Sequence, residues 1–262
     1  MIAETAESRP RRRVRRGAYL LPSLFTIGNM LLGFYAVICG YRDGAFQKAV
    51  LLIFAAAILD MLDGRIARMT GTESEFGKEY DSLADVITFG AAPALLTYFW
   101  GLEDFHPDAW LLSLFFMVCT ATRLARFNVQ TKVVDSRYFV GLPTPAAAGA
   151  ICSLLFFAPD SEWRIWMQVL VAMSLLIIGV LMVSTFRYVS LKKVDLRKRW
   201  SFRALIPIAA IVLVIYFIPR AFFLVVAMVY ALSGPLSYLV GRLRHGGNPP
   251  DDAPPPLPET VP

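Results

Sequence analysis

Long apolar runs separated by short polar segments dominate the chain. The runs are roughly 15–23 residues long, and a helix needs about 20 apolar residues to cross the hydrocarbon core of a bilayer. The pattern therefore predicts an all-α fold, a polytopic membrane helix bundle of about eight transmembrane helices. The predicted spans are 20–39, 46–68, 85–100, 109–126, 142–158, 164–185, 204–218 and 221–240.

The composition excludes the main classes of soluble protein. Of the 262 residues, 56% are hydrophobic and 18% charged, against roughly 45–50% and 25% in a typical globular chain. A soluble fold of this composition would expose too much apolar surface, and a disordered chain would be more polar. The three cysteines, Cys39, Cys119 and Cys152, lie in apolar runs without metal-ligand spacing, and we expect buried thiols.

The positive charges predict the orientation. With the N-terminus inside and alternating loops, 22 of the 26 Lys and Arg residues fall on the inner side, as expected for cytoplasmic loops. We therefore expect an integral protein of the cytoplasmic (inner) membrane with both termini cytoplasmic. The divisions are a basic tail at 1–17, a transmembrane domain at 18–240 and a disordered Pro-rich tail at 241–262. Because the basic runs flank spans and lack interleaved aromatics, we expect contact with membrane lipid and no nucleic acid.

Four aspartates lie at the boundaries of the second and third predicted spans. Asp60 and Asp63 are three residues apart and Asp81 and Asp85 four apart, so each pair shares a helix face. Measured from the opposite ends of their spans at Phe46 and Trp100, Asp60 and Asp85 lie about 21–22 Å deep at 1.5 Å per residue. Both pairs then lie just inside the cytoplasmic face, where two antiparallel neighbouring helices bring them together.

Four such carboxylates cannot all stay ionised in a low-dielectric setting without compensation. Either some hold protons, as in a proton relay, or divalent cations neutralise them; oxygen ligands without His or Cys favour Mg²⁺ or Mn²⁺. The adjacent Gly64 admits close approach, and Arg65 and Arg68 add anion-binding groups. Acids beside arginines suit a metal-bridged diphosphate.

The pattern Asp60-x2-Asp63-Gly64-x2-Ala67-Arg68-x8-Gly77-x3-Asp81-x3-Asp85 resembles the signature of the CDP-alcohol phosphotransferases, with every fixed position present. The resemblance implies an integral membrane enzyme that moves a phosphatidyl group from a CDP-linked lipid to an alcohol and releases CMP. It further implies two metal ions held by Asp60, Asp63, Asp81 and Asp85, with Asp85 as general base. The CDP-lipid site would include Ser23, Thr26, Gly64, Arg68 and Ser74.

Further stretches resemble one branch of that family, the membrane-bound phosphatidylserine synthases. They are PSLFTIGN at 22–29, DSLADVITFGAAPA at 81–94, RLARFN at 123–128, GLPTPAAA at 141–148 and LMVSTFRYVSLKK at 181–193. This resemblance implies CDP-diacylglycerol and L-serine as substrates and a homodimer. Guanidinium groups bind carboxylates well, so the candidates for the serine side are Arg123, Arg126, Asn128 and Arg187.

Two other functions stay open at this point. The same family with another acceptor, glycerol 3-phosphate, inositol phosphate or choline, would share the signature at 60–85. A cation-coupled transporter would also use acids within the membrane. Transporter sites usually lie near the midplane on broken helices, often in paired repeats, whereas these acids are predicted near one face of a chain without an evident repeat.

Overall fold

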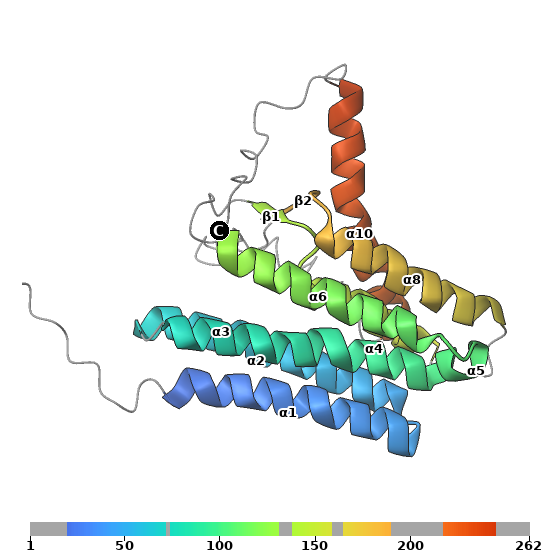
Figure 1. Cartoon of the computed structure of the whole chain (residues 1–262), viewed down its shortest axis with the longest axis horizontal. Coiled ribbons are helices and arrows are strands. Elements are labelled where there is room, and N and C mark those ends of the chain that lie inside the picture. The colour runs from blue at the N-terminus through green and yellow to red at the C-terminus, as the bar shows by residue number, and fades with distance from the viewer. Residues whose placement is uncertain (1–19, 72–73, 131–137, 159–164, 190–216, 245–262) are drawn as a thin grey trace, which may run out of the picture.

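A computed structural model describes residues 20–71, 74–130, 138–158, 165–189 and 217–244 (Figure 1). Most of these residues are helical, and two short strands form a ribbon. The elements in chain order are α1 (Leu20–Asp43), α2 (Phe46–Thr70), α3 (Glu75–Asp85), η2 (Val86–Ala91), α4 (Ala92–Thr97), η3 (Tyr98–Leu102), α5 (Glu103–Phe105), α6 (Trp110–Gln130), β1 (Tyr138–Val140), α7 (Thr144–Phe157), α8 (Ile165–Val183), β2 (Arg187–Val189) and α10 (Pro219–Arg244).

The predicted helix bundle of a membrane protein is confirmed at this level. Within the described residues, five helices are long and apolar enough to cross a membrane: Leu24–Asp43, Glu75–Phe105, Trp110–Val129, Ile165–Val183 and Pro219–Val240. Two further predicted spans correspond to α2, which has 25 residues, and to α7, which has 14. The eighth, 204–218, falls almost wholly outside the described residues, and the count of eight stays a prediction.

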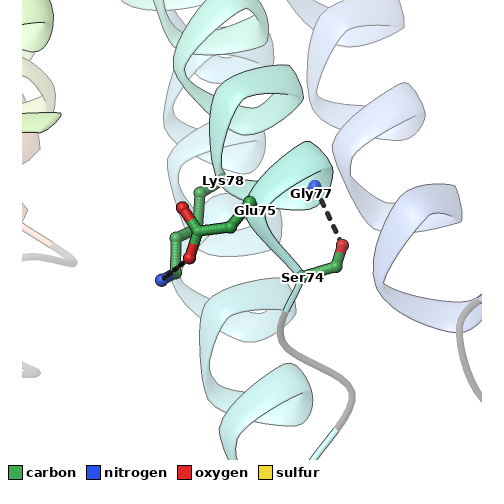
Figure 2. Close-up of polar contacts among 4 residues, drawn as sticks. All are labelled: Ser74, Glu75, Gly77 and Lys78. Carbon is green, nitrogen blue, oxygen red and sulfur yellow. Dashed lines mark hydrogen bonds and ion pairs between the residues drawn. The ribbon is translucent and has the colours of Figure 1, made fainter.

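The helices that carry the aspartates extend beyond their apolar parts. The polar pattern predicts a loop before a third span that begins at residue 85, but α2 continues to Thr70 and α3 begins at Glu75. Gly71 ends α2 in a left-handed conformation (φ +65°), and the Ser74 hydroxyl caps α3 by accepting a hydrogen bond from the Gly77 N–H at 3.0 Å (Figure 2). Lys78 pairs with Glu75 in the same turn, at 3.1 Å. These polar caps stabilise helix ends outside the apolar core.

A small β-ribbon is the other departure from the all-α prediction. Strands β1 and β2 pair antiparallel, with Phe139 opposite Tyr188. The chain leaves β1 through Gly141, whose φ of +79° favours glycine. The Gly141 N–H donates to the Phe186 carbonyl at 2.8 Å, and a side chain there would overlap the Met182 carbonyl. Each strand has three residues, too few for alternation to be recognised in the sequence.

Figure 1 shows how these elements are arranged. Helices α1 and α2 are antiparallel neighbours, and the continuous helical path from α3 to α5 lies beside them. Helix α6 lies along the other side of that path, and α8 packs against α6. Helix α10 packs against α7 and β2 and rises steeply from the bundle. A core of buried apolar residues joins these helices, and the Trp100 indole donates to the Ala158 carbonyl within it at 2.8 Å. This arrangement brings the ends of α2 and α3 that bear the aspartates together.

Candidate metal and substrate site

The Asp63 carboxylate accepts two hydrogen bonds, one from α1 and one from its own helix. Asp63 lies on α2, with 3% of its surface exposed. One carboxylate oxygen accepts a hydrogen bond from the Thr26 hydroxyl of α1, at 3.2 Å, and the other accepts from the N–H of Gly64. A charge buried in this way requires such partners. The two donors therefore fix how the Asp63 carboxylate is oriented.

The other three aspartates converge on Asp63. Asp60, Asp63 and Asp81 each offer a carboxylate oxygen, and these atoms lie within 4.8 Å of one another. The carboxyl groups of Asp60 and Asp85 are in hydrogen-bond contact. Asp81 and Asp85 each keep one buried oxygen without a hydrogen-bond partner among the described residues. Acidic oxygens from α2 and α3 thus meet at one place.

This donor set fits a divalent cation. All of its ligand atoms are carboxylate oxygens, the type that Mg²⁺ and Mn²⁺ prefer. The described part of the chain forms two ion pairs, Lys78 with Glu75 and His106 with Asp108, and neither involves the four aspartates. No lysine or arginine of this part therefore neutralises them by direct pairing. Gly64 adds room, because a Cβ at this position would meet nothing within 4 Å. The cluster therefore offers oxygen ligands for divalent ions, with open space at Gly64.

The residues predicted to bind the CDP-lipid lie in different settings. Thr26 and Gly64 border the carboxylates, as the hydrogen bonds to Asp63 demonstrate. Arg68 is exposed in the last turn of α2, two turns beyond Asp60. Ser74 is exposed, and its hydroxyl caps α3 (Figure 2). The side chain of Ser23 lies outside the described residues.

Arg123 is the predicted acceptor-side residue that interacts electrostatically with one of the four aspartates. Its side chain, on α6, is 7% exposed, and its guanidinium donates to the Thr144 hydroxyl of α7 at 2.7 Å. The guanidinium also lies 5.7 Å from the centre of the Phe127 ring. It interacts electrostatically with Asp85. Its Nε has no hydrogen-bond partner among the described residues, so the group retains capacity for an anionic ligand.

The other acceptor-side candidates join helices to one another. The Arg126 guanidinium donates to the Val183 carbonyl of α8 at 3.1 Å. The Asn128 amide donates to Ser82 at 3.0 Å and to Glu79 at 3.2 Å, which ties α6 to α3. The side chain of Arg187 lies outside the described part of β2. Of these candidates, Arg123 is therefore the one with a described interaction at the carboxylates.

Sequence reasoning overlooked three polar side chains near the cluster: Asn29, Thr144 and Tyr230. Asn29 is fully buried on α1, Thr144 binds Arg123, and Tyr230 of α10 interacts electrostatically with Arg123. A polar residue inside an apolar run is itself a signal of function, and that signal was available for Asn29. For Thr144 and Tyr230, the neighbours become apparent only in the folded chain.

The apolar helices and the converging carboxylates define a membrane-embedded acidic centre, and comparison with known proteins specifies its family. A family model described as CDP-alcohol phosphatidyltransferase matches residues 19–174. These residues include α1, α2 and all four aspartates. The chain belongs to the CDP-alcohol phosphatidyltransferase family.

Three relatives illustrate the similarity. The CDP-diacylglycerol–serine O-phosphatidyltransferase of Helicobacter pylori (strain ATCC 700392 / 26695) is 37% identical over 227 residues, 84% of this chain and 92% of that protein. The protein of the same name from Mycobacterium leprae is 42% identical over 153 residues, 56% of this chain and 50% of that protein. The archaetidylserine synthase of Methanothermobacter thermautotrophicus is 36% identical over 170 residues, 64% and 69% of the two chains.

Proposed function

We propose that the protein is a phosphatidylserine synthase, which transfers the phosphatidyl group of CDP-diacylglycerol to the hydroxyl of L-serine and releases CMP. The observation that carries the proposal is the convergence of Asp60, Asp63 and Asp81 at the helices that the family model matches. A largely buried cluster of carboxylate oxygens suits a negatively charged substrate that binds together with divalent cations.

Asp60, Asp63, Asp81 and Asp85 would hold two divalent ions, Mg²⁺ or Mn²⁺. When bound, such ions offset the charge of a diphosphate and of a departing nucleotide. Thr26 would orient Asp63 through its 3.2 Å hydrogen bond. Gly64 would leave space for the diphosphate, and Arg68, with Ser23 and Ser74 at the ends of α1 and α3, would bind the nucleotide side. A guanidinium is well suited to a phosphate oxygen.

Asp85 would act as the general base. A serine hydroxyl is a weak nucleophile until a positioned base takes its proton. In the proposed step, the serine oxygen forms a bond to the lipid-side phosphorus while the bond from that phosphorus to the CMP oxygen breaks. The hydroxyl proton passes to Asp85, and CMP leaves with the bonding electron pair. The free oxygen of Asp85 is buried and lacks a partner among the described residues, which supports this role.

Serine is the proposed acceptor for two reasons. Two of the three relatives are named for CDP-diacylglycerol and serine and the third for archaetidylserine, so all three names include serine. In addition, Arg123 is a buried guanidinium that interacts electrostatically with Asp85, and its Nε has no hydrogen-bond partner among the described residues. A guanidinium binds carboxylates in a bidentate manner. Serine has a carboxylate next to its hydroxyl. Arg126, Asn128 and Arg187 would support this side of the site indirectly.

The proposed topology follows the positive charges. Eight spans, with both termini and the aspartates on the cytoplasmic side of the inner membrane, would place the site where a soluble amino acid is available. The transmembrane domain would comprise 18–240, between the basic tail and the Pro-rich tail. We further propose a homodimer, on the strength of the family resemblance alone.

An acceptor panel tests the function. Purified protein in detergent is supplied with CDP-diacylglycerol, Mg²⁺ or Mn²⁺, and one acceptor at a time: L-serine, glycerol 3-phosphate, inositol phosphate or choline. We expect CMP release with serine, and formation of phosphatidylserine in equal amount. CMP release that responds to a different acceptor would assign the chain to another branch of the family, and its absence with every acceptor would contradict the proposal.

A further inference from the structure

Asn29 is a buried polar residue that the preceding roles leave unexplained. Its side chain is 0% exposed, in the middle of α1. Neither the oxygen nor the nitrogen of its carboxamide has a hydrogen-bond partner among the described residues. An amide that is buried without partners destabilises the fold, and a leucine of similar volume would not. Such a group is expected where a ligand supplies the missing partners.

The register of α1 and α2 places Asn29 level with Asp60. Thr26 and Asp63 are joined by a hydrogen bond, and the two helices run antiparallel. Asn29 lies three residues after Thr26, and Asp60 lies three residues before Asp63. The two residues are therefore at the same depth, about 4.5 Å along the helix axes from that hydrogen bond. A Cβ at Gly28 would lie 3.3 Å from the Leu59 side chain, which agrees with this register.

The third span approaches Asn29 from the other side. The Thr88 hydroxyl of η2 donates to the backbone carbonyl of Asn29 at 3.3 Å, and Thr88 lies one turn beyond Asp85. Helix α1 and η2 approach closely at this point, as Gly33 indicates: a Cβ there would lie 2.8 Å from the Thr88 hydroxyl oxygen. Asn29 is thus held at the deep end of the carboxylate cluster, near the turns that carry Asp60 and Asp85.

We propose that the Asn29 carboxamide binds the amino-acid acceptor, an inference that rests on the proposed function. An in-line displacement requires the incoming hydroxyl opposite the departing nucleotide. Gly64, proposed to leave space for the diphosphate, and Arg68, proposed to bind the nucleotide side, lie toward the end of α2, so the acceptor belongs at the deeper side with Asn29. An amide can accept a hydrogen bond from an ammonium group and donate one to a carboxylate. The fitting ligand is a small zwitterionic alcohol.

The test measures steady-state kinetics and stability of Asn29→Leu and Asn29→Ala in the full-length protein. We expect the KM for serine to rise about 10- to 100-fold, the loss typical of hydrogen bonds to charged groups, while the KM for CDP-diacylglycerol changes less than about twofold. Serine should also raise the unfolding temperature of the wild type more than that of either variant. Without serine, Asn29→Leu should unfold at the same temperature as wild type or higher, because it removes an unsatisfied buried group.

Ser113→Ala is the matched control, because the Ser113 hydroxyl is also buried and has no hydrogen-bond partner in the part of the chain that the structure describes. Ser113 lies near the start of α6, at the other end of the bundle. The substitution should leave both KM values unchanged. A variant at Asn29 with an unchanged KM for serine, or with a loss confined to kcat, would overturn the inference. If Asn29→Leu does not fold, Asn29→Ala is judged by the same criteria. A wild-type protein without serine-dependent CMP release would instead refute the proposed function.

Discussion

Thr26 of α1 and Asp63 of α2, 37 residues apart in the sequence, are joined by a buried hydrogen bond of 3.2 Å. The bond fixes the depth of the two helices relative to each other, and so determines which residues lie level with each carboxylate. Asp63 also accepts from the Gly64 N–H. With both oxygens engaged, its carboxylate is oriented before any ligand binds, which lowers the cost of assembling a metal site.

Replacement of Thr26 by valine should lower the apparent affinity of the enzyme for Mg²⁺. The substitution keeps the shape of the side chain and removes the donor to Asp63. Groups that hydrogen-bond to a metal ligand typically contribute about 10- to 100-fold in metal affinity or activity. We therefore expect the Mg²⁺ concentration for half-maximal CMP release to rise about tenfold or more. Thr97→Val is the control, because the buried Thr97 hydroxyl donates to carbonyls of its own helix. Equal effects of the two substitutions would contradict the role of Thr26.

Asp85→Asn should abolish most of the turnover. The substitution keeps the shape of the side chain but removes the proposed proton acceptor, and general bases typically contribute about 10²–10⁴-fold. We expect kcat for CMP release to fall by that range while the enzyme still binds CDP-diacylglycerol. Asp108→Asn changes an exposed carboxylate near His106 and should have no effect. Near-normal CMP release by Asp85→Asn would rule out the base assignment.

The fold was predictable where burial in lipid determines the sequence. Apolar runs indicated seven segments that the structure also makes helical, because a spanning helix must be apolar over most of its length. The ends of α2 and α3 were not predictable in this way, since they lie beyond the apolar part and depend on Gly71 and on the Ser74 cap. The three-residue strands were missed because they are short and their paired residues lie 47 to 51 positions apart.

The site was predictable where spacing along one helix determines geometry. Asp60 with Asp63, and Asp81 with Asp85, share faces by the helical period alone. The contacts of Asn29, Arg126 and Asn128 depend instead on the register between helices. A sequence cannot distinguish an arginine that binds a helix carbonyl, as Arg126 does, from one that lies beside the carboxylates. Only the packed structure separates these two roles.

Metal binding should be detectable without catalysis. Mn²⁺ should raise the unfolding temperature of the detergent-solubilised protein in a concentration-dependent manner, because a ligand that binds only the folded state stabilises it. Asp60→Asn removes one of the converging carboxylates and should reduce this shift. EDTA should reverse it, and Mg²⁺ added in excess should restore both stability and CMP release. A shift of the same size in Asp60→Asn and in Asp104→Asn, at an exposed residue of α5, would place the bound ion elsewhere.

Two neighbouring arginines of α6 should differ in their effect on serine. Arg123→Gln removes the buried guanidinium beside Asp85, and we expect the KM for serine to rise about tenfold or more. Arg126→Gln removes a donor to the Val183 carbonyl, so it should lower stability and change the KM for serine less than Arg123→Gln does. Initial rates against serine concentration, at saturating CDP-diacylglycerol, separate the two. If Arg126→Gln raises the KM for serine more than Arg123→Gln does, the assignment of the acceptor side to Arg123 is wrong.

Gly234 should be required for the docking of α10, the helix that lies beyond the residues matched by the family model. The buried Tyr188 of β2 donates to the Ala231 carbonyl at 3.0 Å, and its ring lies against Gly234, where any Cβ would overlap it. Burial, with a contribution from Tyr230, raises the pKa of Tyr188 to about 12, so its hydroxyl stays protonated and remains a donor.

Gly234→Ala should therefore lower the unfolding temperature, because overpacking costs about 1–3 kcal/mol. Gly149→Ala is the matched control: a Cβ at Gly149 of α7 meets nothing within 4 Å, and alanine stabilises a helix by about 1 kcal/mol relative to glycine. The two substitutions should thus change stability in opposite directions, as thermal unfolding in detergent would measure. If Gly234→Ala were as stable as Gly149→Ala, the packing of α10 on Tyr188 would not contribute to the fold.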